Sequence, residues 1–229
     1  MYSGQLQAYS PQIFGNASLE NTGKVLLPPS VLNTIYSNEE NIPTVLLFCI
    51  TNINNRQKIY AGVLQFTAHE GHIIMPYWMM EAIQITEGSI VRVNTTSLPT
   101  GTSAAFQPKD SSFMELKDTK VILEHTLRQH PCLTQGSVIP IDFANKTYFL
   151  KIFKTEPKEG IFTLKADLAV DFAPPETEFK HRWLEPDTDS SDDGNDLEER
   201  VGRTIRGKEV VVREEKKIKH STFEIISRQ

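Results

Sequence analysis

The stretch that most constrains the fold is residues 61–93, AGVLQFTAHEGHIIMPYWMMEAIQITEGSIVRV. Apolar and aromatic residues dominate positions 63–66 and predict a strand. That strand stops at Glu70-Gly71, where glycine can adopt the positive φ that a tight turn requires. Residues 72–75 are again rich in β-branched side chains. The first half of the stretch therefore predicts a hairpin of two strands.

The second half of the stretch predicts a short helix followed by another strand. Pro76 suits the first turn of a helix better than a sheet interior, because its φ is fixed and it has no N–H. Gly88 marks a turn, after which residues 89–93 resume as a strand. Helical spacing places three apolar side chains on one side of the helix: Tyr77, Met80 and Ile83. We interpret the whole stretch as the unit of a small closed barrel with a helix plugging one end.

The residues before this stretch add a polar arm, two strands and a helix. Residues 1–22 are mostly polar and predict an extended N-terminal arm. Residues 24–27 predict a strand, which Pro28-Pro29-Ser30 ends. The helix that follows buries Val31, Leu32 and Ile35. Residues 45–51, VLLFCIT, form a continuous apolar run of strand length, which predicts a strand buried on both faces.

A second module follows a loop rich in Thr, Ser, Pro and Gly at residues 95–105. Its helix covers residues 118–130, with Asp118 as the N-cap and Pro131 as the stop. Strands are predicted at residues 137–141, 147–153 and 161–170. One helix beside three strands makes a small α+β unit.

Beyond Pro174-Pro175 the composition changes to segregated charge. Residues 185–199 contain eight acidic and no basic residues, and few large apolar side chains accompany them. Such a segment cannot bury enough surface to offset the entropy of ordering, so we expect a largely disordered tail. The predicted organisation is an arm at 1–22, a barrel at 23–105, an α+β module at 106–175 and a tail at 176–229.

Composition narrows the class of protein. The formal net charge of −5 argues against a nucleic-acid partner, because such proteins usually carry a basic face. The chain has neither a long uncharged apolar run nor a signal-peptide pattern at its start, so we expect a soluble, intracellular protein without membrane insertion. Cys49 and Cys132 lack CxxC spacing and are predicted to be reduced, partly buried thiols.

No pattern of catalytic or metal-binding residues emerges from the sequence. His69-Glu70-Gly71-His72 lacks the spacing and the third ligand of a zinc site and is interpreted as a solvated hairpin tip. His125 and His130 fall on the predicted helix of the second module, in capping or surface roles. We predict no catalytic residue, no metal and no cofactor. A last group, Trp78, Met79 and Met80, is interpreted as core rather than as a binding patch.

Several of these segments resemble the N-terminal region of the ubiquitin fusion degradation protein 1 family. They occur in the family's order between about residues 22 and 174, and the Pro-Tyr-Trp-Met-Met block and the Cys-Leu-Thr after the second helix are the specific ones. The matching segments are residues 24–32 (KVLLPPSVL), 47–52 (LFCITN), 62–66 (GVLQF), 70–80, 87–88 (EG), 106–108 (FQP), 121–139 and 170–172 (VDF).

The resemblance implies a fold and a function. The fold is a double-psi β-barrel followed by a small α/β roll, an architecture also found at the N-terminus of the AAA+ segregase valosin-containing protein. The implied function is that of a non-catalytic adaptor, cytoplasmic and nuclear, which binds ubiquitin or polyubiquitin through the barrel surface. With a nuclear protein localisation protein 4 homologue it recruits ubiquitylated substrates to the hexameric segregase for unfolding and proteasomal degradation, including ER-associated degradation. The resemblance assigns no particular face of the barrel to ubiquitin.

The tail departs from the family pattern, since it contains no Phe-x-Gly-x-Gly peptide for docking on the segregase. Its only apolar clusters are therefore the candidate partner-binding residues: Val210, Val212, Phe223, Ile225 and Ile226. Two alternatives stay open, because a fold does not determine function. One is a protein- or nucleic-acid-binding module on the same double-psi barrel, and the other is a barrel enzyme whose active site has no recognised motif.

Overall fold

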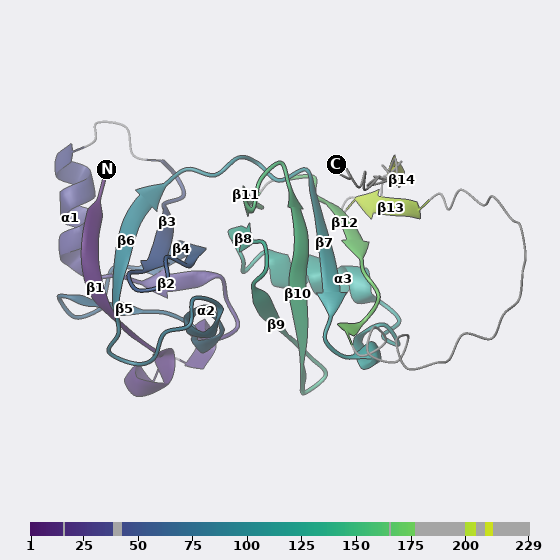
Figure 1. The fold of residues 1–229 in the computed structure, drawn as a ribbon, viewed down its shortest axis with the longest axis horizontal. Helices are drawn as coiled ribbons and strands as arrows, with labels where there is room; N and C mark the ends of the chain where they lie inside the picture. Colours follow the sequence, from purple (N-terminus) through teal and green to yellow (C-terminus); the bar gives the residue numbers. More distant parts are fainter. Residues whose placement is uncertain (16, 39–42, 165, 177–199, 205–208, 213–229) are drawn as a thin grey trace, which may run out of the picture.

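Six strands close into a barrel in the first half of the chain, and a second sheet occupies the next part (Figure 1). The computed structural model describes residues 1–15, 17–38, 43–164, 166–176, 200–204 and 209–212. The barrel strands follow one another around the barrel in the order β1-β5-β2-β4-β3-β6. Their bounds are β1 Ser3–Tyr9, β2 Lys24–Leu26, β3 Leu47–Asn52, β4 Lys58–Gln65, β5 His72–Ile74 and β6 Ile90–Thr96. The predicted closed barrel is confirmed.

The predicted N-terminal arm is wrong for residues 3–9, which form barrel strand β1. This strand pairs in parallel with β5, where Gln7 lies opposite His72, and antiparallel with β6, where Ser3 lies opposite Asn94. Leu6 and Ala8 are buried in the core, and Gln5 and Gln7, which alternate with them, are exposed. Only two short apolar side chains mark the alternation, so pairing on both sides, rather than local hydrophobicity, makes this segment a strand.

The predicted hairpin within residues 61–93 is also wrong, although both of its strands exist. Gly71 adopts φ of 79° and the chain reverses there, as expected. However, β2 lies between β4 and β5, pairing in parallel with β4 and antiparallel with β5. A segment about 40 residues earlier in the chain therefore takes the place of the expected hairpin partner.

Two helices and two 3₁₀ turns cover the barrel, namely α1 Pro29–Asn38, α2 Tyr77–Ala82, η1 Pro11–Phe14 and η2 Ala17–Leu19. In α1, Val31 and Ile35 have no exposed surface. In α2 the core interpretation is confirmed, because Trp78, Met79 and Met80 are buried. The expected apolar side of α2 is wrong at Tyr77, whose side chain is 52% exposed.

Strand β3 is fully buried on its inner face and partly buried on its outer face, where Leu47 is 6% exposed, so the predicted burial on both faces holds only in part. Phe48 and Ile50 point into the barrel with no exposed surface. Cys49 and Thr51 point outward and are half-buried. Apolar character on both faces therefore does not separate a partly covered barrel strand from a fully covered one.

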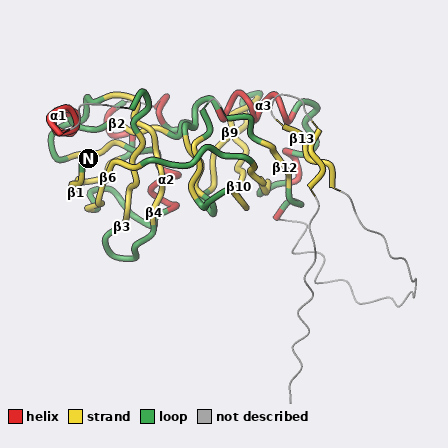
Figure 2. Tube along the Cα trace, turned by 90° about the horizontal axis from the view of Figure 1, so that it is seen from above, coloured by secondary structure: helices red, strands yellow, loops and turns green. Residues whose placement is uncertain are grey.

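The second module contains a sheet with one helix, α3, against it. The strand order is β14-β13-β12-β7-β10-β9, and β11 and β8 form a separate pair. Figure 2 shows α3 along one side of β9 and β10. Ile122, Leu123 and Leu127 of α3 belong to the same buried core as Tyr148 and Leu150 of β10. The bounds are β7 Ser103–Pro108, η3 Ser111–Phe113, α3 Thr119–Leu127, β8 Cys132–Thr134, β9 Val138–Phe143, β10 Lys146–Glu156, β11 Gly160–Phe162, β12 Ala169–Phe172, β13 Arg200–Thr204 and β14 Glu209–Val212.

The module boundaries differ from the predicted ones in two places. The proposed division between residues 105 and 106 falls inside β7, and residues 97–102 connect the barrel to that strand. Strands β13 and β14 extend the second sheet from β12, so two short pieces of the predicted tail are ordered as strands. The remaining tail residues, 177–199, 205–208 and 213–229, lie outside the described residues. Within the described part of the chain, no helix is long and apolar enough to cross a membrane.

Candidate functional site

The two modules meet closely on one side of their junction, where glycines of the barrel face the end of α3. A Cβ on Gly62 would lie 2.5 Å from Cγ of Pro131, and a Cβ on Gly23 would lie 2.9 Å from Cα of His130. The backbone N–H of Gly23 donates to the carbonyl of Gln129 at 3.0 Å. Only a residue without a side chain permits such close approach of backbone to a neighbouring module. We call this set of contacts the closed side of the junction.

His130 and Trp78 fill the closed side. Their ring centroids are 5.9 Å apart, and Nδ1 of His130 lies 2.9 Å from the carbonyl oxygen of Thr126 in the last turn of α3. The capping role predicted for His130 is therefore confirmed, and the surface role is wrong, because the residue has no exposed surface. Burial lowers the pKa of His130 to about 4. Among the described residues, neither Nε2 of His130 nor Nε1 of Trp78 has a hydrogen-bond partner.

Next to these contacts, two residues before Gly62 on β4, the junction opens into a cleft of about 380 Å³. One wall comes from barrel strand β4, a second from the end of β6 and the connection between the modules, and a third from the turn between β10 and β11. The lining residues are Lys58, Tyr60, Thr96, Ser97, Leu98, Pro99, Lys158, Glu159 and Gly160. We call this feature the junction cleft.

Tyr60 joins the β4 wall of the junction cleft to the second module. Its backbone N–H donates to Oγ1 of Thr134 in β8 at 3.0 Å. Its ring lies against Gly160, where any Cβ would overlap it. Nζ of Lys58 is 5.9 Å from the centroid of the same ring, within the range of a cation–π interaction. The pKa of Lys58 is raised, first by its electrostatic interaction with Tyr60 and, to a smaller degree, by Glu159.

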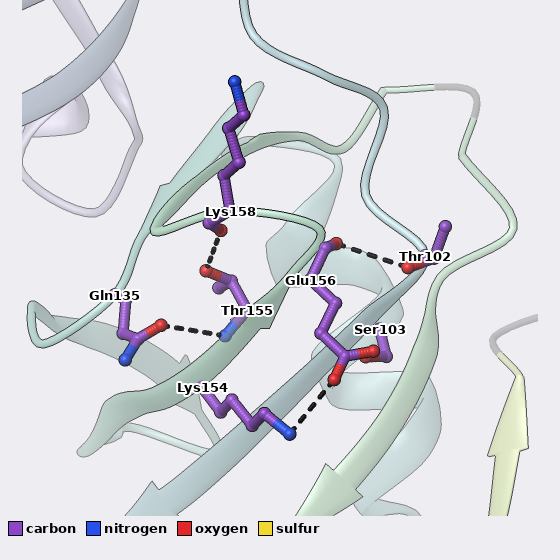
Figure 3. Close-up of polar contacts among 7 residues, drawn as sticks. All are labelled: Thr102, Ser103, Gln135, Lys154, Thr155, Glu156 and Lys158. Carbon is purple, nitrogen blue, oxygen red and sulfur yellow. Dashed lines mark hydrogen bonds and ion pairs between the residues drawn. The ribbon is translucent and has the colours of Figure 1, made fainter.

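Lys158 and Glu159 sit on a turn that a network of polar contacts holds in place (Figure 3). Oγ1 of Thr155 donates to the carbonyl of Lys158 at 2.5 Å, and the N–H of Thr155 donates to Oε1 of Gln135 at 3.4 Å. The backbone N–H of Thr102 donates to the carbonyl of Glu156 at 3.0 Å. The Lys158 side chain points away from this network. The turn is thus anchored while its lysine stays available.

The carboxylate of Glu156 is engaged within the network and does not line the junction cleft. It accepts a hydrogen bond from Oγ of Ser103 at 3.0 Å and forms an ion pair with Nζ of Lys154 at 3.0 Å. These contacts lower the pKa of Glu156, the hydrogen bond from Lys154 most strongly. Glu159 is therefore the one carboxylate among the cleft-lining residues.

The structure separates the candidate partner-binding residues of the tail. Val210 and Val212 lie in β14, the last strand of the second sheet. Phe223, Ile225 and Ile226 lie outside the described residues. The two valines are far from the junction cleft in the sheet order, because β13, β12 and β7 intervene before β10.

The residues considered for chemistry fall in separate places. His69 is exposed and His72 half-buried at the turn before β5, with ring centroids 6.3 Å apart, as the hairpin-tip interpretation expects for His69. Both cysteines are free, and burial raises the pKa of Cys132. Within the residues that the structure describes, no group of three or more His, Cys, Asp or Glu side chains could hold a metal ion.

Sequence reasoning missed the junction cleft entirely. Lys58 and Lys158 are 100 positions apart in the chain, and neither belongs to a recognisable motif. The only local signal is Gly160 after the turn, which reads as an ordinary loop residue. Its contact with Tyr60 becomes visible only when the two modules are placed together.

Two family models match consecutive parts of the chain. Residues 2–99 match the model described as "Ubiquitin fusion degradation protein UFD1, N-terminal subdomain 1", and residues 100–175 match "N-terminal subdomain 2" of the same protein. The division between them falls in the connection between β6 and β7. These matches confirm the resemblance drawn from the sequence motifs.

Relatives of known name give the same result. The "Ubiquitin fusion degradation protein 1 homolog" of Dictyostelium discoideum is 40% identical over 158 residues, which cover 69% of this chain and 47% of the relative. The human "Ubiquitin recognition factor in ER-associated degradation protein 1" is 34% identical over 178 residues, covering 76% and 57%. "Ubiquitin fusion degradation protein 1" of Saccharomyces cerevisiae is 36% identical over 156 residues, covering 67% and 43%. The chain spans about half the length of these relatives.

Proposed function

The chain belongs to the ubiquitin fusion degradation protein UFD1 family, and from this premise we propose that it is a non-catalytic ubiquitin-binding adaptor in ubiquitin-dependent degradation, including ER-associated degradation. The proposal rests on one observation. The first family model matches the residues that form the barrel, and the second matches residues of the second module. The barrel supplies the ubiquitin-binding surface, and the second module fixes its orientation through the closed side of the junction.

The proposed adaptor works with two partners. A nuclear protein localisation protein 4 homologue pairs with the chain, and the hexameric AAA+ segregase receives the ubiquitylated substrate, in the cytoplasm and the nucleus. The name of the human relative, a ubiquitin recognition factor in ER-associated degradation, supports ubiquitin recognition in that pathway.

The surface of the barrel favours weak binding that a ubiquitin chain strengthens by avidity. Among its exposed apolar side chains, Leu64 on β4 and Ile90 on β6 are 46% and 51% exposed and lie on strands that β3 separates. An interface built on a few such residues is small, and small interfaces bind weakly. Linking several ubiquitins raises the effective concentration of the second contact, so polyubiquitin binds more tightly than a single ubiquitin.

Titration of the ¹⁵N-labelled full chain with mono- and tetraubiquitin tests ubiquitin binding. We expect chemical-shift changes confined to one face of the barrel and tighter binding of tetraubiquitin. The single variants Leu64→Asp and Ile90→Asp locate the face, and Val121→Asp on α3, also exposed at 63%, is the matched control. A spectrum that does not change at millimolar ubiquitin rules out the proposed function.

A copurification experiment tests the role of the tail. The variants Val210→Asp/Val212→Asp and Phe223→Asp/Ile225→Asp/Ile226→Asp are compared with the unchanged chain for recovery of the segregase and the nuclear protein localisation protein 4 homologue. We expect at least one variant to lose a partner while retaining ubiquitin binding. Full recovery of both partners by both variants contradicts the tail hypothesis and leaves the ubiquitin-binding proposal intact.

A further inference from the structure

We propose that the junction cleft binds an extended acidic peptide segment of a partner protein. This proposal goes beyond the ubiquitin-binding proposal, since the site needs residues of both modules. Lys58 comes from barrel strand β4 and Lys158 from the turn between β10 and β11, so each module contributes one lysine to the lining of the cleft.

The charges in the junction cleft select an anionic occupant. The titratable side chains that line it are Lys58, Tyr60, Lys158 and Glu159. Two lysines against one glutamate leave a net positive charge of one at neutral pH, in a chain whose formal net charge is −5. No ion pair within the described residues engages Lys158. The cleft is thus positively charged in a negatively charged chain. It attracts an acidic partner, and this attraction weakens as the salt concentration rises.

The remaining lining residues favour a peptide over a simple anion. Tyr60, Leu98 and Pro99 are half-buried and provide apolar surface alongside the two lysines. The volume of about 380 Å³ lies within the range of roughly 300–1,000 Å³ typical of ligand sites. In a peptide that alternates carboxylates with aliphatic side chains, the carboxylates can pair with the lysines and the aliphatic side chains can cover the apolar surface. A phosphate or another small anion leaves that apolar surface exposed to water.

The junction cleft is preorganised, which limits the entropy lost on binding. The ring of Tyr60 packs on Gly160, and the N–H of Tyr60 bonds to Oγ1 of Thr134, so the barrel wall is tied to the second module. The turn that carries Lys158 is fixed by its hydrogen bond from Thr155 (Figure 3). Both lysine-bearing walls thus have defined positions before any partner arrives.

Fluorescence anisotropy on the full chain tests this inference. The probe is a fluorescein-labelled peptide, Asp-Leu-Glu-Asp-Leu-Glu-Asp-Leu, and its control replaces every Asp by Asn and every Glu by Gln. We expect the acidic peptide to bind at least tenfold more tightly than the neutral one, with affinity falling as salt rises. The variant Lys58→Glu/Lys158→Glu is expected to bind at least tenfold more weakly than the unchanged chain.

A charge-matched variant separates the cleft from the overall charge of the chain. Lys109→Glu/Lys117→Glu changes the net charge by the same amount at two exposed lysines outside the cleft. We expect it to bind the acidic peptide within twofold of the unchanged chain. Equal loss of binding in both double variants overturns the proposal, because the attraction would then be general.

Three further measurements test the proposal. Chemical-shift mapping with the unchanged chain is expected to place the acidic peptide at Tyr60, Ser97 and Gly160, and shifts elsewhere without these three refute the site. Inorganic triphosphate serves as a competitor. If triphosphate binds through the two lysines and the acidic peptide does not, the cleft is a small-anion site and the peptide proposal is wrong.

Ubiquitin titration of Lys58→Glu/Lys158→Glu is expected to be unchanged, so either proposal can fail alone.

Discussion

Two neighbouring regions of the junction between the modules are built differently. On the closed side, Gly23 and Gly62 let the barrel backbone approach Pro131 and His130, and Trp78 fills the remaining space. On the open side, charged and half-buried side chains surround a cleft. Backbone and ring contacts hold the modules together in both regions, whereas the lysines of the cleft are exposed, so their charge can be changed with little effect on stability.

The largest expected effect comes from emptying the closed side. Trp78→Ala removes a large buried side chain and is expected to lower the free energy of unfolding by about 3–5 kcal/mol. Tyr77→Ala, at the exposed neighbouring position, is the control and is expected to change it by less than about 0.5 kcal/mol. Urea denaturation of both variants measures the difference. Equal free energies of unfolding for the two variants would show that Trp78 does not stabilise the junction.

The pH dependence of stability tests the burial of His130. Its pKa in the folded chain is about 4, below the ordinary value of 6.5, so the unfolded chain binds the proton more readily. The free energy of unfolding is therefore expected to fall by about 3 kcal/mol as the pH decreases from 6.5 to 4. His130→Gln cannot titrate there. Urea denaturation across this range is expected to show a weaker pH dependence for the variant, and identical curves refute the assignment.

The same substitution on each side sharpens the comparison further. Gly62→Ala places a methyl group against the buried ring of Pro131 and is expected to cost about 1–3 kcal/mol of unfolding free energy. Gly160→Ala would make its Cβ overlap a ring carbon of Tyr60, so the ring must leave its position against Gly160 and a similar cost of about 1–3 kcal/mol is expected. Thermal unfolding measures both costs. A loss below about 0.5 kcal/mol for Gly160→Ala would show that the contact between Tyr60 and Gly160 does not hold the modules together.

The smallest effect on stability is expected at the lysines of the cleft. Lys58→Gln and Lys158→Gln replace exposed side chains and are each expected to change the unfolding free energy by less than about 0.5 kcal/mol. Both variants are nevertheless expected to bind the acidic peptide more weakly. Calorimetric melting and the anisotropy assay, done on the same preparations, test this separation. A melting temperature as low as that of Trp78→Ala would show that the open side also holds the fold.

Sequence reasoning located most elements but not their partners. The short helix after Pro76 and the strands on either side were predicted correctly, because proline, glycine and the apolar pattern act locally. The expected hairpin failed because β2, from an earlier segment, pairs with both of its strands. The first half of strand β7 was predicted as loop, since Ser103-Ala104-Ala105 carries little β-propensity and depends on pairing with β10.

The candidate site was not predictable in the same way. His130 was recognised as a residue near the end of a helix, and the bond from its ring to the Thr126 carbonyl agrees. Its burial depends on Trp78 and Gly23 of the other module, which no local pattern reports. The cleft lysines carry no signal at all, because an exposed lysine on a strand or a turn is ordinary in any soluble protein.

By itself, the sequence determined that this chain has two β-rich modules, that the first closes around an apolar interior, and that its motifs match one family. Short-range physics suffices for this, since side-chain periodicity and turn residues act within a few positions. The tertiary structure alone decided which strands pair, that β1 completes the barrel, and that Lys58 and Lys158 flank one cleft. Those outcomes depend on packing between segments far apart in the chain. The surface buried when these segments pack together outweighs the local preference of each segment for helix, strand or loop.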